Sequence, residues 1–183
     1  MSIVRSALTT VMALALPLQP ATERPSFAEG QIGAGHARSS FVEQVRQATE
    51  VYRDVNNAQP AGYQPALGCV SGPLVGAMGV HFVNGSLLMN DTVEIDKPEA
   101  LIYEFHNNAA RLVGVEYIVT YDAWHATHKL DDPPILEGQL LQLVDSPNRF
   151  GLPRFYELHA WAWRDNPNGT FVDWNPLVSC DQK

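Results

Sequence analysis

The sequence feature that most constrains the fold is a pair of β-rich segments joined by a very short connection. Residues 100–106 and 111–120 are rich in β-branched and aromatic side chains, and Asn107-Asn108 stands between them as a tight turn would. Because so short a connection cannot cross over a sheet, the two strands can pair only in the antiparallel direction. Segments of the same kind recur, and the further predicted strands are residues 77–83, 139–144, 155–164 and 170–174.

The predicted turn before the last strand also favours antiparallel pairing. Asn166-Pro167-Asn168-Gly169 separates the last two segments, and Asn-Gly is the strongest short signal for a hairpin. The chain from residue 62 onward is therefore predicted to be mainly antiparallel β structure.

One amphipathic helix is predicted before the first strand. Ser40 and Glu43 have the spacing of a capping box. Apolar residues then follow at helical spacing and form one stripe, made by Phe41, Val45, Ala48, Tyr52 and Val55. The fold class that follows is α+β and mainly antiparallel β: a curved sheet or small barrel with one N-terminal amphipathic helix packed on it. Residues 39–183 are predicted to form this single β-rich domain.

The first residues are interpreted as a targeting segment. Residues 1–21 contain Arg5 and then an uncharged, mainly apolar stretch at 7–18. That stretch is too short to cross a bilayer, which takes about 20 residues, and it is typical of a signal peptide. Residues 22–38 contain Pro and Gly without periodicity, which predicts a flexible leader. This interpretation gives a periplasmic or secreted protein, and the alternative is a disordered arm on a cytosolic one.

The two cysteines agree with export. Cys69 and Cys180 are the only two in the chain, and they are too far apart for a CxxC motif. A pair of cysteines in an oxidising compartment most often forms a bridge, so a disulfide is predicted between them. Two buried free thiols are the alternative.

The charge balance excludes one large class of partners. The chain has 12 Lys and Arg against 20 Asp and Glu, a net charge of −8, and its basic residues are scattered singly. Nucleic-acid binding needs a dense basic face that neutralises phosphates, so nucleic acid is excluded as a partner. We expect a small-molecule ligand and no membrane span.

An ionisable residue stands near the middle of each of four apolar segments. Because side chains alternate between the two faces of a strand, each of these residues shares a face with apolar neighbours. A lone carboxylate in a core is very costly unless it is paired, protonated or bound to a metal ion. We therefore expect one cluster that binds a divalent metal ion, with the ligands His81, Glu104, Glu116 and His159.

Two glycines favour a cavity beside this cluster. Gly79 and Gly114 each lie two residues before an ionisable residue and on the same strand face. Glycine inside a strand often marks the close approach of a ligand or of another backbone. The walls of the expected pocket are Phe155, Glu157, Trp161 and Trp163.

A site of two histidines and two glutamates indicates metal binding and does not specify one reaction. Mixed nitrogen and oxygen ligands suit zinc first, and also iron, manganese, nickel or copper. We expect an exported metal-binding protein that acts as a metalloenzyme on a small polar or aromatic molecule. One of Glu116 and Glu104 would be the carboxylate ligand and the other the general base, and the sequence does not assign the two roles. The alternative is a non-catalytic carrier with a Trp-lined pocket, and a structural polar core is the third interpretation.

Several sequence blocks also resemble a known group. They are Gly68-Cys-Val-Ser-Gly-Pro73, Met78-Gly-Val-His-Phe-Val-Asn84, Leu112-Val-Gly-Val-Glu-Tyr117, Glu157-Leu-His-Ala-Trp161 and Asn175-Pro-Leu-Val-Ser-Cys180. In this order they resemble a group of uncharacterised exported bacterial proteins, over roughly residues 40 to 180. No activity is attached to that group, so the resemblance implies only a natural, complete bacterial chain and does not choose a substrate.

Overall fold

The computed structural model describes residues 40–107 and 109–181. The predicted signal peptide (1–21) and leader (22–38) lie outside the described residues. A helix at 40–49 is followed by the elements η1 (Glu50–Arg53), η2 (Val55–Asn57), β1 (Tyr63–Pro65), β2 (Val70–Gly72), β3 (Gly76–Asn84), α2 (Gly85–Leu88), β4 (Ala100–His106), β5 (Ala109–Thr120), α3 (Tyr121–His125), β6 (Ile135–Leu136), β7 (Gln139–Leu140), β8 (Gln142–Val144) and β9 (Phe155–Ala160).

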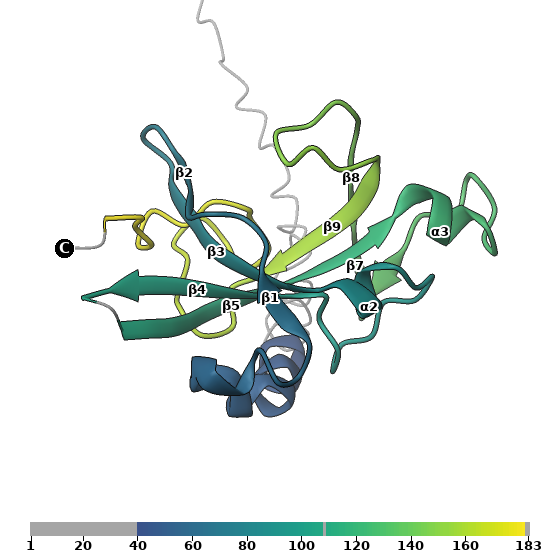
Figure 1. Ribbon diagram of the computed structural model, residues 1–183. Helices are drawn as coiled ribbons and strands as arrows, with labels where there is room; N and C mark the ends of the chain where they lie inside the picture. The colour runs from purple at the N-terminus through teal and green to yellow at the C-terminus, as the bar shows by residue number, and fades with distance from the viewer. Residues whose placement is uncertain (1–39, 108, 182–183) are drawn as a thin grey trace, which may run out of the picture.

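One curved antiparallel sheet dominates the structure (Figure 1). Its strand order is β1-β3-β4-β5-β9-β8, with β2 also paired to β3, and every pairing is antiparallel. The two edge strands β1 and β8 pair with one neighbour each and not with each other, so the sheet stays open over the described residues. The curved-sheet prediction is therefore confirmed, and the small-barrel alternative is wrong.

The predicted strands differ in how closely they match. β3, β4 and β5 correspond to three of them, and β4 has the predicted bounds. The segment 139–144 divides into β7, which pairs with β6, and β8, which pairs with β9. Residues 170–174, predicted to be a strand, contain none in the structure.

The fifth predicted strand ends early for a local reason. β9 stops at Ala160, although the prediction ran to Arg164. The backbone N–H of Ala162 donates to the carbonyl of Ala160 at 2.9 Å, which closes a tight three-residue turn. Such a turn ends the two-residue alternation of side chains, so residues after it no longer continue the faces of β9.

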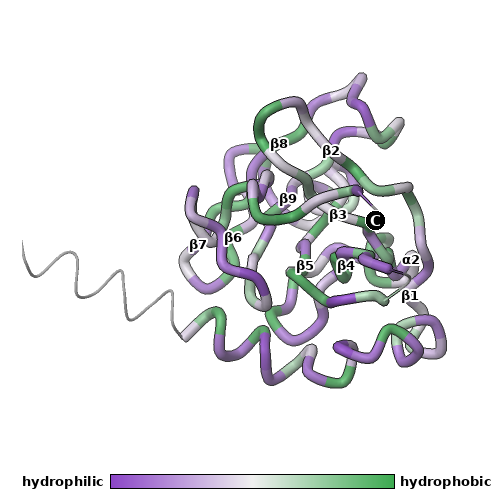
Figure 2. Tube along the Cα trace, turned by 90° about the vertical axis from the view of Figure 1, so that its left-hand side faces the viewer, coloured by the Kyte–Doolittle hydropathy of each residue, from purple (hydrophilic) through white to green (hydrophobic). Residues whose placement is uncertain are grey.

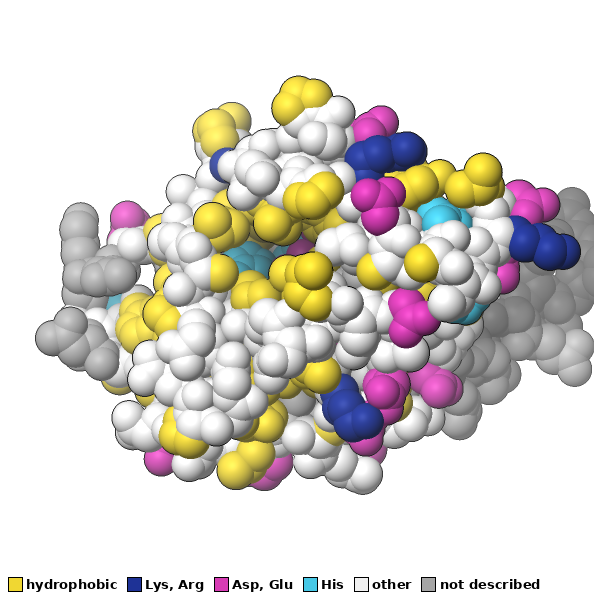
Figure 3. Space-filling model, turned by 45° about the vertical axis from the view of Figure 1, so that its right-hand side comes forward, with side chains coloured by type: hydrophobic (Ala, Val, Ile, Leu, Met, Phe, Trp, Pro, Cys, Tyr) yellow, Lys and Arg dark blue, Asp and Glu magenta, His cyan; other side chains and the backbone are white. Residues whose placement is uncertain are grey.

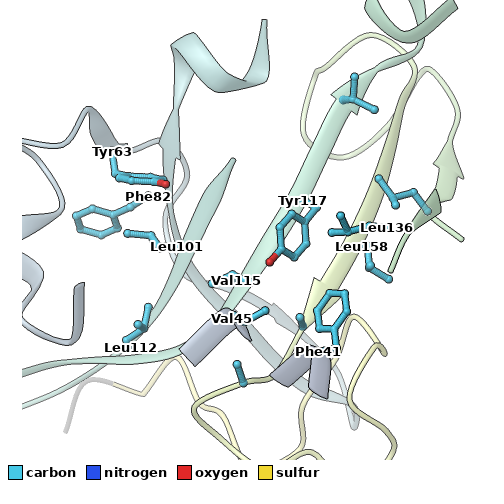
Figure 4. Packing of buried hydrophobic residues seen from close by; sticks show 14 of the residues in the cluster. Phe41, Val45, Tyr63, Phe82, Leu101, Leu112, Val115, Tyr117, Leu136 and Leu158 are labelled. Carbon is cyan, nitrogen blue, oxygen red and sulfur yellow. The ribbon is translucent and has the colours of Figure 1, made fainter. Parts of the chain in front are cut away.

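The N-terminal helix covers one face of the sheet and builds the larger core. Figure 2 shows hydrophobic and hydrophilic residues alternating along this helix at the bottom of the view. Phe41 and Val45 of the predicted stripe are buried, and in Figure 4 they lie over Val115, Tyr117 and Leu158 of the sheet. The helix is shorter than the stripe predicts, because the chain continues from residue 50 as the 3₁₀ turns η1 and η2.

The C-terminal segment returns to the sheet and is tied there covalently. The backbones of Ala77 and Asn175 exchange two hydrogen bonds of 3.1 Å. Cys69, just before β2, forms the predicted disulfide with Cys180, with Cα atoms 5.6 Å apart. None of the described helices is long and apolar enough to cross a membrane.

Candidate metal centre

Three of the four predicted ligands meet on the sheet face opposite the helix. His81 comes from β3, Glu116 from β5 and His159 from β9, and Glu116 is directly opposite His159 in the strand pairing. Their strand neighbours one residue away, such as Phe82 and Val115, belong to the helix-side core. The alternation of side chains therefore puts all three on the same face, as predicted.

The distances within this cluster suit a metal ion. His81 Nε2 lies 3.3 Å from Glu116 Oε2, and His159 Nδ1 lies 3.9 Å from Glu116 Oε1. The three residues each offer a ligand atom within 4.8 Å of the others. Two atoms bound to zinc at about 2.0–2.1 Å in a tetrahedron are separated by about 3.3 Å. The cluster is therefore close to the spacing that one bound ion requires.

Two further carboxyl groups adjoin His159. Asp173 Oδ1, from the segment that follows β9, is 3.7 Å from His159 Nδ1. Glu157 lies two residues before His159 on the same strand face, and with Asp173 it forms a second group of possible ligands that shares His159. Sequence reasoning missed Asp173, because nothing local in residues 170–174 indicates that they fold back over β9.

Buried polar atoms in this region have no hydrogen-bond partner among the described residues. They are His81 Nδ1, both ring nitrogens of His159, and Glu157 Oε2. His81 is 4 % exposed, and His159 is 1 % exposed. Nearly all buried polar groups in folded proteins are hydrogen-bonded, so a concentration of unpaired ones indicates a site that takes a ligand.

Burial sets the protonation states of the cluster. It lowers the pKa of His81 to about 4 and lowers the pKa of His159 well below its usual value, so both imidazoles are neutral at pH 7. Burial, followed by the nearby carboxyl of Glu157, raises the pKa of Glu116 well above its usual value. Burial also raises the pKa of Glu157 to about 7. Neutral imidazole is the form that binds metal, whereas a carboxylic acid must first lose its proton.

A cavity of about 220 Å³ opens beside two members of the cluster. His81 and Glu116 line it, and its walls are otherwise apolar, with Val83, Leu88, Ile118, Phe150, Leu152 and Phe155 among them. Figure 3 shows this hollow rimmed by hydrophobic side chains, with histidine and acidic colours at its bottom. The centre is therefore accessible from one side through an apolar pocket.

The two glycines do not border this open space, contrary to the sequence interpretation. A Cβ on Gly79 would lie 2.8 Å from the carbonyl oxygen of Tyr103. A Cβ on Gly114 would lie 2.9 Å from the carbonyl oxygen of Ala160 and 3.3 Å from the ring of Trp161. Both glycines allow the close approach of neighbouring backbone, and the cavity lies elsewhere.

Glu104, the fourth predicted ligand, lies outside the cluster. It is on the same sheet face, but two residues beyond Ile102, the partner of His81 on β4. At about 3.3 Å per residue, this offset moves Glu104 away from His81 along the strand. Its Oε1 accepts a hydrogen bond of 3.0 Å from the backbone N–H of Ser179.

The predicted pocket residues divide between three places. Phe155 lines the cavity, Glu157 borders the cluster, and the ring of Trp161 stacks beside His159 with ring centres 6.3 Å apart. Trp163 lies on the helix side, where its Nε1 donates to Thr49 Oγ1 at 3.0 Å. The prediction of a Trp-lined pocket is therefore corrected: the turn after β9 sends Trp163 to the other face.

No family model, curated protein or solved structure matches this chain. The resemblance to exported bacterial proteins stays a prediction, and the function has to be argued from the cluster and its pocket.

Proposed function

We propose that this protein binds a divalent metal ion through His81, Glu116 and His159, with zinc as the first candidate. The observation that carries the proposal is a pair of buried, neutral histidines whose ring nitrogens lie 3.3 Å and 3.9 Å from the two oxygens of one buried carboxyl group. A mixed nitrogen and oxygen set of this kind suits zinc, iron, manganese, nickel or copper. Burial of an ionisable carboxyl in an apolar sheet face also has its simplest explanation in a bound cation.

The position of the pocket favours His81, Glu116 and His159 as the ligands over the second group, formed by Glu157, His159 and Asp173. Both groups of possible ligands contain His159, and one ion at His159 Nδ1 cannot use all five residues equally well. Only the first set has members on the cavity wall, namely His81 and Glu116. We therefore assign Glu157 and Asp173 to the outer side of the centre, where carboxyl groups orient and polarise a metal-bound histidine.

Three protein ligands leave a coordination position free for water or for a substrate atom. An ion in that arrangement lowers the pKa of bound water to about 7 or polarises a substrate oxygen, which is the basis of hydrolytic metal catalysis. The proposed protein is therefore a metal-binding protein whose open position faces the pocket, and a metalloenzyme if that position activates water. Glu104 has no part in the proposed centre, because its carboxyl accepts a hydrogen bond from the backbone N–H of Ser179.

The second candidate is a carrier that binds a small molecule without metal. One observation favours it: His81 and Glu116 lie 3.3 Å apart on the wall of an otherwise apolar cavity. Burial raises the pKa of Glu116 there, so the metal-free pocket offers a protonated carboxyl as donor beside a neutral histidine as acceptor. A neutral molecule with one hydrogen-bonding group could bind there directly. The protein without metal would then be the functional form.

We further propose that the protein is exported to the periplasm or the medium. The disulfide between Cys69 and Cys180 supports an oxidising compartment. Determination of the N-terminal residue of the mature protein tests this proposal, since removal of residues 1–21 is expected.

Elemental analysis of protein purified without a metal-affinity column tests the metal proposal. Near-stoichiometric metal is expected in the parent protein, and loss of it is expected in His81→Ala and His159→Ala. The matched control is His106→Ala, which removes an exposed histidine at the end of β4. Retention of stoichiometric metal by both site variants would contradict the ligand assignment, and no uptake by the parent after reconstitution would favour the carrier.

A further inference from the structure

The apolar pocket beside the metal centre identifies a class of ligand, and this inference rests on the proposed function. We infer that the pocket takes a small aromatic molecule of one or two rings with an oxygen donor at one end, such as a phenol or an aryl carboxylate. The ring would occupy the apolar pocket, and the oxygen would complete the coordination of the proposed ion at the end of the pocket that His81 and Glu116 line.

The size of the pocket sets the first limit. Its volume is about 220 Å³. An engineered cavity of about 150 Å³ with Leu, Ile and Phe walls is known to stay dry and to bind benzene. A space moderately larger than that one accommodates a substituted benzene or a two-ring molecule, and it is too small for a nucleotide or an oligosaccharide.

The chemistry of the walls sets the second limit. His81 and Glu116 are the only ionisable residues on the described lining, and the remaining lining residues are apolar. A sugar presents hydroxyl groups all round its ring, and each would lose its hydrogen bonds to water on entering such walls. A molecule with one polar end and an apolar body loses hydrogen bonds to water only at its polar end, and that end would lie at the proposed metal centre.

Two aromatic side chains favour a flat ring over an aliphatic chain. Phe150 and Phe155 both line the pocket, with ring centres 6.1 Å apart and ring planes at 64°. Aromatic rings contact one another preferentially in offset or edge-to-face arrangements, and such contacts add stabilisation beyond the buried area. A ligand ring in the pocket can meet one phenylalanine by its edge and the other by its face.

The position of the polar groups explains the need for a single donor atom. His81 is 4 % exposed and Glu116 5 % exposed, and both reach the pocket from the sheet at its bottom. A ligand oxygen that reaches this point meets the proposed ion directly. Oxygen donors suit the same metal ions as the mixed histidine and carboxylate set, so phenolic or carboxylate oxygen completes the coordination.

Four probes separate the ring from the donor atom. Benzoate and acetate carry the same donor with and without a ring, and phenol and toluene carry the same ring with and without an oxygen. The full-length protein is loaded with Co²⁺, whose visible absorption reports a new ligand, and binding is measured by that absorption and by calorimetry. We expect benzoate to bind at least tenfold more tightly than acetate, and phenol at least tenfold more tightly than toluene.

A variant that fills the pocket keeps the test specific. Ala66 is an exposed residue on the pocket wall, and Ala66→Trp is expected to retain the metal and to weaken phenol at least tenfold. Val51→Trp, at an exposed position on η1 away from the pocket, is the matched control and is expected to bind phenol like the parent.

The outcomes distinguish the inference from the function on which it rests. If the protein retains metal but binds acetate as tightly as benzoate, the proposed ligand class is wrong and the metal centre is unaffected. The same conclusion follows if Ala66→Trp retains metal and binds phenol with the affinity of the parent. Absence of metal uptake by the parent protein overturns both.

Discussion

Glu116 and His159 face each other directly across the β5–β9 pair, with Glu116 Oε1 3.9 Å from His159 Nδ1. The other oxygen of the same carboxyl group lies 3.3 Å from His81. One carboxyl group thus stands between two histidines from two other strands. This relationship makes Glu116 the residue through which the proposed metal site is tested most directly.

Replacement of Glu116 by glutamine should weaken metal binding by roughly tenfold or more, about 1.4 kcal/mol at least, because a neutral amide oxygen is a poorer ligand than a carboxylate. The fold should survive, because burial already favours the uncharged form of this side chain. Competition titration with a chromogenic chelator measures the affinity. The same substitution at Glu104, which lies on the same sheet face outside the cluster, is the control and should have no effect.

Equal metal affinity in Glu116→Gln and Glu104→Gln would show that the ion, if present, is held elsewhere. The second group of possible ligands, formed by Glu157, His159 and Asp173, would then be the next to replace.

Gly114 should be intolerant of a side chain because strand β9 lies so close to it. An added Cβ would be 2.9 Å from the carbonyl of Ala160, so Gly114→Ala has to push β5 and β9 apart. We expect a loss of about 1–3 kcal/mol in the free energy of unfolding, measured by urea denaturation. Gly85→Ala is the control, since a Cβ there meets nothing within 4 Å. Equal stability of the two variants would mean that the strands adjust freely at this point.

Glu99 should make the protein less stable as the pH rises. It is 1 % exposed, and burial raises its pKa to about 8. The folded protein therefore keeps this proton up to about pH 8, whereas the unfolded chain loses it near the ordinary value of 4.5. Unfolding releases a proton between these limits, so the stability falls by about 1.4 kcal/mol per pH unit on account of this group.

Glu99→Gln removes the titrating group and with it the pH-dependent loss of stability. It keeps an acceptor oxygen for the backbone N–H of Ile118, which in the parent protein donates to Glu99 at 2.8 Å. We expect a flatter decline of stability between pH 5 and 8 and a more stable protein at pH 8 than the parent. Urea denaturation at several pH values in the presence of a chelator measures both. A variant that is less stable than the parent at pH 8 would show that the carboxyl is ionised in the folded protein.

Strand and face assignments could be predicted from the sequence wherever the alternation of side chains continues unbroken. His81, Glu116 and His159 share a face because the alternation is regular at each of them, although β5 has a register shift between Leu112 and Gly114. The disulfide was predictable because the chain has two cysteines and therefore one possible intramolecular pair. Both inferences need only local pattern or counting.

The incorrect predictions depend on contacts between distant segments. Trp163 changes face because the chain turns at Ala160–Ala162, and no residue type there signals the turn. Asp173 reaches His159 because the last segment folds back over the sheet, where the backbone N–H of Trp161 donates to the carbonyl of Thr170 at 3.0 Å. Closure into a barrel likewise depends on whether the two edge strands meet, which no single strand encodes.

The disulfide should stabilise the fold without positioning the proposed metal ligands. It joins Cys69 and Cys180 across a sequence separation of 111, and the loss of chain entropy in the unfolded state is about 4–5 kcal/mol for a loop of that order. We expect the double variant Cys69→Ser, Cys180→Ser to lose up to that amount in urea denaturation. The proposed ligands His81 and Glu116 lie on strands β3 and β5, which both pair with β4. These pairings do not involve the bridged cysteines.

Metal content therefore separates the role of the bridge from that of the centre. The double variant should bind metal with nearly the affinity of the parent under conditions in which both are folded. Reductant should destabilise the parent protein and leave the double variant unchanged, which controls for other effects of the reagent. Loss of metal from a folded double variant would mean that the C-terminal segment, with Asp173 3.7 Å from His159, supplies an essential ligand.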